Sequence, residues 1–222
     1  MNYIIVDFEM NPIAREYKAE KAICRSEIIE IGAIILNDEL TILGEYKTLV
    51  KPQYSTAISK KYESLTGIST HMVDGAPLFE AAYESFVCWR ESYGDDYEIY
   101  AWSENDYKQL IAEMQLKKYD KQEMMRPLER WNDFQLEYTQ KLGLERALSL
   151  DQALSYAAVD FAGMRHDALC DARNTAKLFA IVRDEGRKNT VLKSVLDALR
   201  PKNVGGTLGD RIDFGALMMQ IA

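Results

Sequence analysis

Short apolar runs, rich in β-branched residues, dominate the first part of the chain. The run at Tyr3–Asp7 is too short for a stable helix, and it predicts a buried strand that ends on an acid. Two longer runs, Glu27–Leu36 and Thr41–Val50, are joined by a short polar link, which predicts a hairpin. The mixed polar segment Met10–Arg25 between the first two runs predicts a loop.

Helical periodicity dominates the rest of the chain. The most regular apolar stripe lies in Ala168–Val182. The other predicted helices are Ala57–Leu65 (closed by Gly67), Pro77–Tyr93, Asp106–Leu116, Asp133–Leu142, Leu150–Ala158 and Thr190–Leu199. Two further apolar runs, Tyr97–Trp102 and Leu128–Trp131, predict a fourth strand and a short edge strand. Three successive strands followed by alternating helices and strands indicate an α/β protein with a mixed sheet flanked by helices.

The 222 residues fit one large domain with a small appendage. We expect the domain to span residues 1–186. Residues 187–222 then form a short C-terminal extension, which ends in an apolar piece, Phe214–Ile221, and whose role the sequence does not indicate.

Composition and charge narrow the possible classes of protein. Hydrophobic residues make up 47% and charged residues 28%, as in ordinary globular proteins. No apolar run approaches the ~20 residues of a membrane span, and the start has no basic segment, so we expect no membrane span, no signal peptide and a cytoplasmic location. The net charge of −8 argues against binding nucleic acid by bulk charge, but it leaves open an enzyme with a local cleft.

Four carboxylates stand where predicted elements begin or end. Asp7 and Glu9 occupy alternate positions at the end of the first strand, so both side chains share one face of the sheet. An acid pair leaving an apolar strand is unfavourable unless a cation neutralises it or water reaches it. Asp106 and Asp171, taken singly, are ordinary acids at the start of a helix or on its solvated face.

Taken together, the four acids predict a metal site. If they converge at one edge of the sheet, their oxygen ligands suit Mg²⁺ or Mn²⁺. Two such ions can act on the attacking and leaving oxygens of a phosphoryl displacement. His166 lies five residues before Asp171, and the two share a site only if His166 precedes the helix, with Asp167 as its N-cap. A histidine is suited to take a proton from the attacking water.

Three ordered motifs resemble those of the DEDDh 3′–5′ exonucleases. The first is VDFEM, which contains Asp7 and Glu9. The second is AWSEND, in which Trp102 precedes Asp106 by four residues. The third is HDALCDARNTAKLF, a histidine followed by four residues and an aspartate that opens a helix. The segments EIIEIGAI and LTGI also resemble the family, and RWNDFQLEY is most similar to the branch that includes the histone-mRNA and small-interfering-RNA exonucleases.

This resemblance implies an RNase H-like fold with a five-stranded mixed sheet over residues 1–186, the exonuclease domain. It implies that two Mg²⁺ or Mn²⁺ ions are held by the four acids, Asp7, Glu9, Asp106 and Asp171. His166 would be the general base. The substrate would be the 3′ end of single-stranded nucleic acid, RNA in preference to DNA, with nucleoside 5′-monophosphates as products.

Substrate contacts and function leave alternatives open. Phe8 and Met10 flank the acids and either stack on a terminal base or, for Phe8, belong to the core. A group of basic residues after the second motif forms either a phosphate track or a solvated helix face; its members are Lys117, Lys118, Lys121, Arg126 and Arg130. The alternative functions are a DNA-trimming exonuclease of the same fold and a regulatory protein that acts through an unidentified protein partner.

Overall fold

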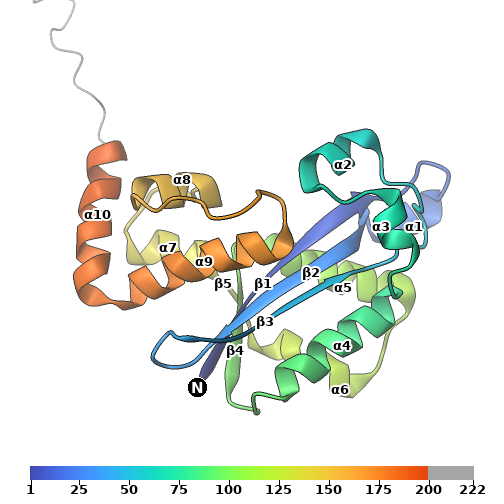
Figure 1. Ribbon diagram of the computed structural model, residues 1–222, viewed down its shortest axis with the longest axis horizontal. Coiled ribbons are helices and arrows are strands. Elements are labelled where there is room, and N and C mark those ends of the chain that lie inside the picture. The colour runs from blue at the N-terminus through green and yellow to red at the C-terminus, as the bar shows by residue number, and fades with distance from the viewer. Residues whose placement is uncertain (200–222) are drawn as a thin grey trace, which may run out of the picture.

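A five-stranded mixed sheet forms the centre of the molecule (Figure 1). The structure is a computed structural model, which describes residues 1–199 of the chain. The strands lie in the order β3-β2-β1-β4-β5. Their bounds are β1 Asn2–Pro12, β2 Ser26–Leu36, β3 Ile42–Leu49, β4 Tyr97–Ala101 and β5 Trp131–Asp133. β2 is antiparallel to β1 and to β3, whereas β4 is parallel to β1 and to β5. The predicted α/β class and the mixed five-stranded sheet are confirmed.

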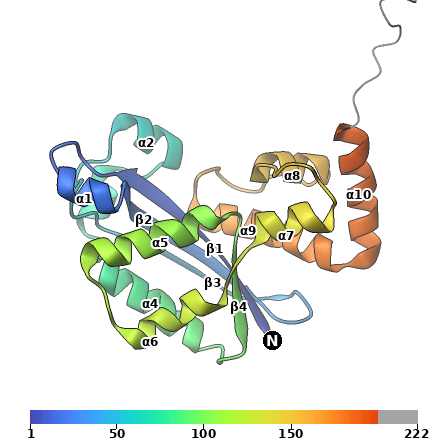
Figure 2. The ribbon, with the colours of Figure 1, turned by 180° about the vertical axis from the view of Figure 1, so that it is seen from behind.

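Helices cover both faces of this sheet. Within the described residues they are α1 Lys18–Ile23, α2 Lys60–Thr66, α3 Thr70–Asp74, α4 Phe79–Glu91, α5 Glu104–Lys117, α6 Gln122–Met125, α7 Phe134–Lys141, α8 Leu150–Tyr156, α9 Ala168–Arg183 and α10 Glu185–Leu199. In Figures 1 and 2, α7 to α10 gather on one side of the sheet, and α4 to α6 lie on the other. None of the described helices is both long and apolar enough to cross a bilayer.

The alternation of side chains along β1 separates two cores. Ile5 packs with residues of α7, α8 and α9, including Phe134 and Phe179. Ile4, Val6 and Phe8 point to the other face and pack with α4 and α5. Since Asp7 and Glu9 follow Ile5 at intervals of two, they lie on the α9 face.

The first strand is longer than predicted. β1 continues past Asp7 to Pro12, and it pairs with β2 as far as Ser26, with a register shift between Glu9 and Met10. The polar residues after Asp7 hide the strand pattern in this half of β1. Pairing with β2 stabilises it, and not the intrinsic strand propensity of its residues. The two acids therefore lie inside a central strand and not at its end, and α1 occupies part of the predicted loop.

Other boundaries shift by a few residues. β5 starts at Trp131, because Arg126–Arg130 forms a 3₁₀ helix, η1, where an edge strand was predicted. Helix α2 spans Lys60–Thr66 and is closed, as expected, by Gly67, whose φ of 74° lies in the left-handed region. The short helix α3 was not predicted.

The last helix joins the core of the domain. α10 begins at Glu185, five residues before the predicted start. Its Val191 and Val195 are buried in the same cluster as Phe179 of α9. The division of the chain after residue 186 stays a prediction, and the apolar piece Phe214–Ile221 lies outside the described residues.

Candidate active site

The two acids of β1 face the N-terminus of α9. Glu9 is buried, with 8% of its surface exposed, and Asp7 is half-buried. In the antiparallel register, Asp7 lies opposite Gly32 and Glu9 lies opposite Glu30. Two neighbouring strands, β1 and β2, therefore carry three carboxylates on one face of the sheet, where water reaches them only in part.

Asp106 approaches these acids from α5. The helix starts at Ser103, whose side chain accepts a hydrogen bond from the Asn105 backbone N–H, and this places Asp106 in the first turn. Asp106 is buried, and its Oδ1 accepts a hydrogen bond of 3.1 Å from the backbone N–H of Phe8. Because Phe8 lies between Asp7 and Glu9 in the chain, this bond fixes Asp106 beside both acids.

The Phe8 side chain belongs to the core. It is 4% exposed and packs against Trp131, with the ring centroids 6.0 Å apart. Of the two alternatives for Phe8, the structure supports the core residue, because the side chain points away from Asp7 and Glu9. The expectation that the Phe8 ring stacks on a terminal base is therefore wrong. Met10 is half-buried beyond the register shift, and its role stays a prediction.

Asp171 and His166 come from the start of α9. Asp167 is the N-cap, with its Oδ1 accepting a 3.0 Å hydrogen bond from the Cys170 N–H. His166 precedes the helix in a left-handed conformation, with φ of 59°, and its backbone N–H donates to Asp171 Oδ2 at 3.1 Å. The sequence allows His166 and Asp171 to share one site only if His166 precedes the helix and Asp167 caps it, and the structure has this arrangement.

These residues converge. One potential ligand atom each of Glu9, His166 and Asp171 lies within 4.8 Å of the others. An open cavity of about 170 Å³ adjoins them, lined by His166 and Asp171 together with Ser149, Leu150, Asp151, Phe161 and Arg165. His166 is exposed at this cavity, whereas Glu9 is buried.

Burial and mutual repulsion raise the pKa of every acid in the site. Burial first, and then the charges of Asp106 and Asp171, raise the pKa of Asp7 well above its ordinary value. Burial is also the largest cause for the other three, with further repulsion from neighbouring carboxylates. It raises the pKa of Glu9 to about 8, of Asp106 to about 7 and of Asp171 to about 6. Four crowded acids that resist ionisation are a donor set that divalent cations would stabilise, so the residues fit Mg²⁺ or Mn²⁺.

The raised pKa values predict a pH-dependent effect of metal on stability. An acid whose pKa is higher in the folded than in the unfolded protein, where it is near 4, stabilises the fold fully below about pH 4. This contribution is lost as pH rises through the values of Asp171, Asp106 and Glu9, about 6 to about 8. The increase in melting temperature on adding Mg²⁺ or Mn²⁺ should therefore grow over this range, which scanning fluorimetry can measure. A metal effect that is constant or shrinks with rising pH would contradict this assignment.

Glu30 and Lys47 support the site, although the sequence pattern predicted no role for either residue. Glu30 is buried, and its Oε2 accepts a 2.9 Å hydrogen bond from the Ala168 N–H at the start of α9. Its Oε1 lies 3.2 Å from Lys47 Nζ, and Lys47 also pairs with Asp167. The sequence does carry a signal in EIIEIGAI, where Glu30 interrupts the apolar stretch that follows Glu27.

Gly32 lets α9 approach the sheet. A Cβ at this position would lie 2.2 Å from the backbone carbon of Ala168 and from the nitrogen of Leu169. These neighbours are backbone atoms, so they can give way only if the helix N-terminus moves. Gly32 on β2 and Ala168 at the start of α9 are 136 positions apart in the chain, and the missing side chain lets them pack closely. Because Asp7 on β1 lies opposite Gly32, this packing brings Asp171 of α9 toward Asp7.

We expect Gly32→Ala to destabilise the protein by about 1–3 kcal/mol, as overpacking does, and to lower activity by displacing Asp171. Chemical denaturation and nuclease assays measure the two effects. Gly75→Ala is the matched control, because Gly75 has a φ of −93° and no atom within 4 Å of the added Cβ. Equal stability and activity of the two variants would show that α9 tolerates the extra methyl group.

The basic residues after the second motif do not form one track. The side chain of Lys117 is 2% exposed and pairs with Glu27. Lys121 pairs with Glu84. A solvated helix face is therefore the wrong interpretation for Lys117, and a single phosphate track does not describe the group. Arg126 and Arg130 line a separate pocket.

Comparisons with known proteins agree with this geometry. The family model named RNase_T and described as exonuclease matches residues 4–179. The chain is 28% identical to an ERI1 exoribonuclease 2 of Danio rerio over 204 residues, 82% of this chain and 35% of that protein. It is 28% identical to the Xenopus laevis protein of the same name over 214 residues, 86% of this chain and 30% of that protein. The chain thus spans about a third of the length of these relatives.

Solved structures share the fold. The nuclease domain of 3′hExo, a DEDDh family member bound to rAMP, matches with a TM-score of 0.73 and 24% identity, covering 83% of this chain and 92% of that chain. Exonuclease I of E. coli with a dT13 oligonucleotide matches with a TM-score of 0.59 and 14% identity, covering 85% and 42%. At these identities the likeness establishes the fold alone.

Proposed function

Because this chain belongs to the RNase_T family of exonucleases, we propose that it is a two-metal-ion 3′–5′ exonuclease that acts on single-stranded RNA and releases nucleoside 5′-monophosphates. One observation carries the proposal. Glu9, His166 and Asp171, which come from opposite ends of the chain, bring ligand atoms within 4.8 Å of one another. Asp7 lies on the same face of β1, and Asp106 is tied to the residue between Asp7 and Glu9.

The carboxylates and the histidine of the site have different proposed roles. Asp7, Glu9, Asp106 and Asp171 would hold two divalent ions, which when bound supply Lewis-acid activation of the phosphate and of the attacking water. His166 takes up the proton that this water releases as its oxygen attacks phosphorus and the 3′ oxygen of the preceding nucleotide leaves. Its exposure at the open cavity lets the imidazole pass this proton to solvent.

The backbone ties around α9 orient the general base. The backbone of His166 is held at the start of α9, because its N–H donates a hydrogen bond to Asp171 and the next residue, Asp167, caps the helix. Glu30 holds the first amide of the same helix. Any shift of the α9 N-terminus therefore moves Asp171 and His166 together.

RNA is favoured over DNA by the relatives. The Danio rerio and Xenopus laevis proteins are named exoribonucleases, and the 3′hExo nuclease domain was solved with rAMP. A DNA-trimming enzyme on the same fold is the alternative that the substrate test separates.

We expect a 5′-labelled single strand of RNA to yield a descending ladder and a matched DNA strand to be cut more slowly. A 3′-phosphate should block digestion, because its extra negative charge would meet Asp7 and Glu9 when the terminal nucleotide enters. Products resolved on a denaturing gel report both effects. Equal cleavage of a circular single strand would show an endonuclease instead, and faster digestion of DNA would favour the alternative substrate.

A further inference from the structure

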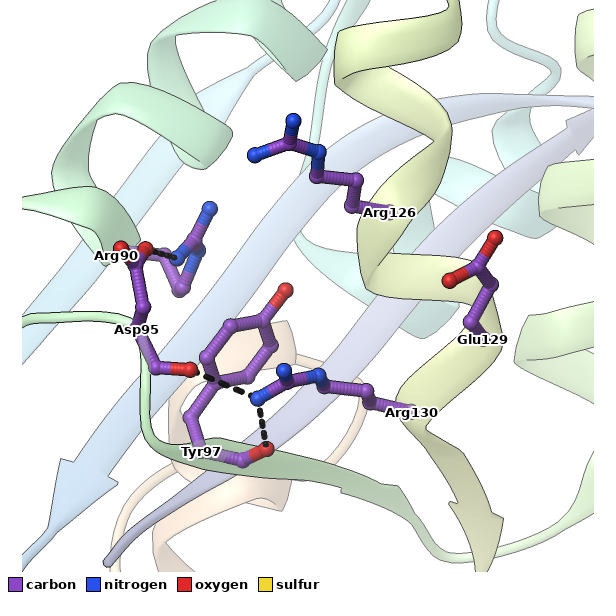
Figure 3. Close-up of a pocket in the computed structure, with 6 residues that line it drawn as sticks. All are labelled: Arg90, Asp95, Tyr97, Arg126, Glu129 and Arg130. Atoms are coloured by element: carbon purple, nitrogen blue, oxygen red, sulfur yellow. Dashed lines mark hydrogen bonds and ion pairs between the residues drawn. The ribbon is translucent and has the colours of Figure 1, made fainter.

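A polar pocket lies far from the candidate active site. Its volume is about 320 Å³, and its lining residues are Arg90, Asp95, Tyr97, Arg126, Glu129 and Arg130 (Figure 3). Tyr97 starts β4 and pairs with Asn2, five residues before Asp7 on β1. At about 3.3 Å per residue, this places the pocket roughly 17 Å from Asp7 along the strand, toward the opposite end of the sheet.

Arg90 reaches the pocket from α4 with unused hydrogen-bond donors. The residue is 2% exposed. Its Nη2 donates to Glu91 Oε1 at 3.0 Å, but Nε and Nη1 have no hydrogen-bond partner among the described residues. Nη1 lies 3.5 Å from Oδ1 of Asp95, whose side chain is almost fully exposed. A buried guanidinium with empty donors is unfavourable unless a ligand or water fills them.

Tyr97 fixes two of the guanidinium groups. Arg90 lies over its ring at 4.3 Å from the centroid, and Arg130 lies at 4.7 Å. Arg130 also donates to the backbone carbonyls of Asp95 at 2.6 Å and of Tyr97 at 3.2 Å. These contacts hold both cations in place before any ligand arrives, which reduces the entropy lost on binding.

Arg126 completes the set. It extends from η1 toward Arg90, whereas Glu129 on the same turn points away from that pair (Figure 3). Among the residues whose side chains the structure describes, none forms an ion pair or side-chain hydrogen bond with Arg126. Three guanidinium groups thus face one pocket in a protein whose net charge is −8.

We propose that this pocket binds a phosphate group. Guanidinium forks match the oxygens of phosphate in pairs, and several of them around one polar cavity are typical of phosphate recognition. The two carboxylates of the lining, Asp95 and Glu129, leave an excess of positive charge. The phosphate comes either from the backbone of a nucleic acid, at a stretch remote from the cleaved end, or from a free mononucleotide. The proposal does not depend on the chemistry at Asp7.

Direct binding tests the proposal with two probes. Isothermal titration calorimetry with AMP and fluorescence anisotropy with a labelled oligoadenylate 20-mer are carried out in chelator, so that no cleavage occurs. Arg126→Gln should weaken binding about tenfold, as loss of a charge-assisted hydrogen bond does. Glu129→Gln should tighten binding, because it removes a repelling carboxylate from the lining.

Arg187→Gln is the matched control. Arg187 is exposed near the start of α10, so this variant makes the same change in net charge away from the pocket. Its affinity for both probes should equal that of the wild type. Weakening of both probes by Arg126→Gln indicates a mononucleotide site, and weakening of the 20-mer alone indicates a backbone site. If neither probe binds the wild type, or if Arg126→Gln and Arg187→Gln bind alike, the pocket is not a phosphate site.

Discussion

Replacing Asp7 by asparagine should lower nuclease activity by about 10³-fold or more and, at the same time, raise the melting temperature of the metal-free protein. The loss follows if Asp7 holds the ions that stabilise charge in the transition state, a contribution of several kcal/mol at about 1.4 kcal/mol per factor of ten. The gain follows because burial and the neighbouring acids raise the pKa of Asp7 well above its ordinary value. The folded protein therefore disfavours the ionised carboxylate, and a neutral side chain of the same shape relieves this cost.

Nuclease assays and thermal unfolding in chelator measure the two halves of this prediction. The expected stabilisation should grow as pH rises above about pH 4, because Asp7 is then ionised in the unfolded protein, whereas the folded protein must either keep it protonated or bear its buried charge. Asp120→Asn is the control, since Asp120 is exposed beyond α5 and should change neither quantity. An Asp7→Asn protein that keeps its activity would remove Asp7 from the metal site, and one that unfolds at a lower temperature without metal would contradict the raised pKa of Asp7.

Replacing His166 by alanine should lower kcat by about 10²- to 10⁴-fold, the usual contribution of a general base. Metal affinity should survive, because the four carboxylates supply the proposed ligands. The structure makes this a demanding test, since a potential ligand atom of His166 lies within 4.8 Å of those of Glu9 and Asp171. His71→Ala is the matched control: it removes the other histidine of the chain, which is exposed on α3.

The measurement is kcat at saturating Mn²⁺ from about pH 5.5 to about pH 9, with metal affinity determined by calorimetry. The acidic limb of the wild-type profile should change in His166→Ala and persist in His71→Ala. A near wild-type kcat with an unchanged limb would exclude His166 from the reaction. Loss of metal binding together with activity would make it a ligand or a structural support.

The sequence carries the elements of the site but not all of its supports. The spacing of His166, Asp167 and Asp171 predicts a cap followed by a helix, because these contacts are local. The role of Glu30 could not be predicted from the sequence, because its hydrogen-bond partner Ala168 is 138 positions away. Lys117 shows the same limit: its burial depends on Glu27, 90 positions distant.

Strand β1 shows a different limit. Its second half reads as polar, and its extension to Pro12 depends on pairing with β2 rather than on its own residues. The length of β1 changes the site, since it places Glu9 opposite Glu30 inside the sheet. Pairing between distant segments is thus the information that periodicity along one segment lacks.

We propose that this chain cuts nucleic acid from the 3′ end with divalent ions held by Asp7, Glu9, Asp106 and Asp171. The most direct test incubates the purified protein with 5′-labelled single-stranded RNA, in Mg²⁺ or Mn²⁺ and in excess chelator, and resolves the products by length. We predict a ladder that shortens from the 3′ end with either metal and no cleavage in chelator. Full activity in excess chelator would show that cleavage does not need divalent ions at these acids.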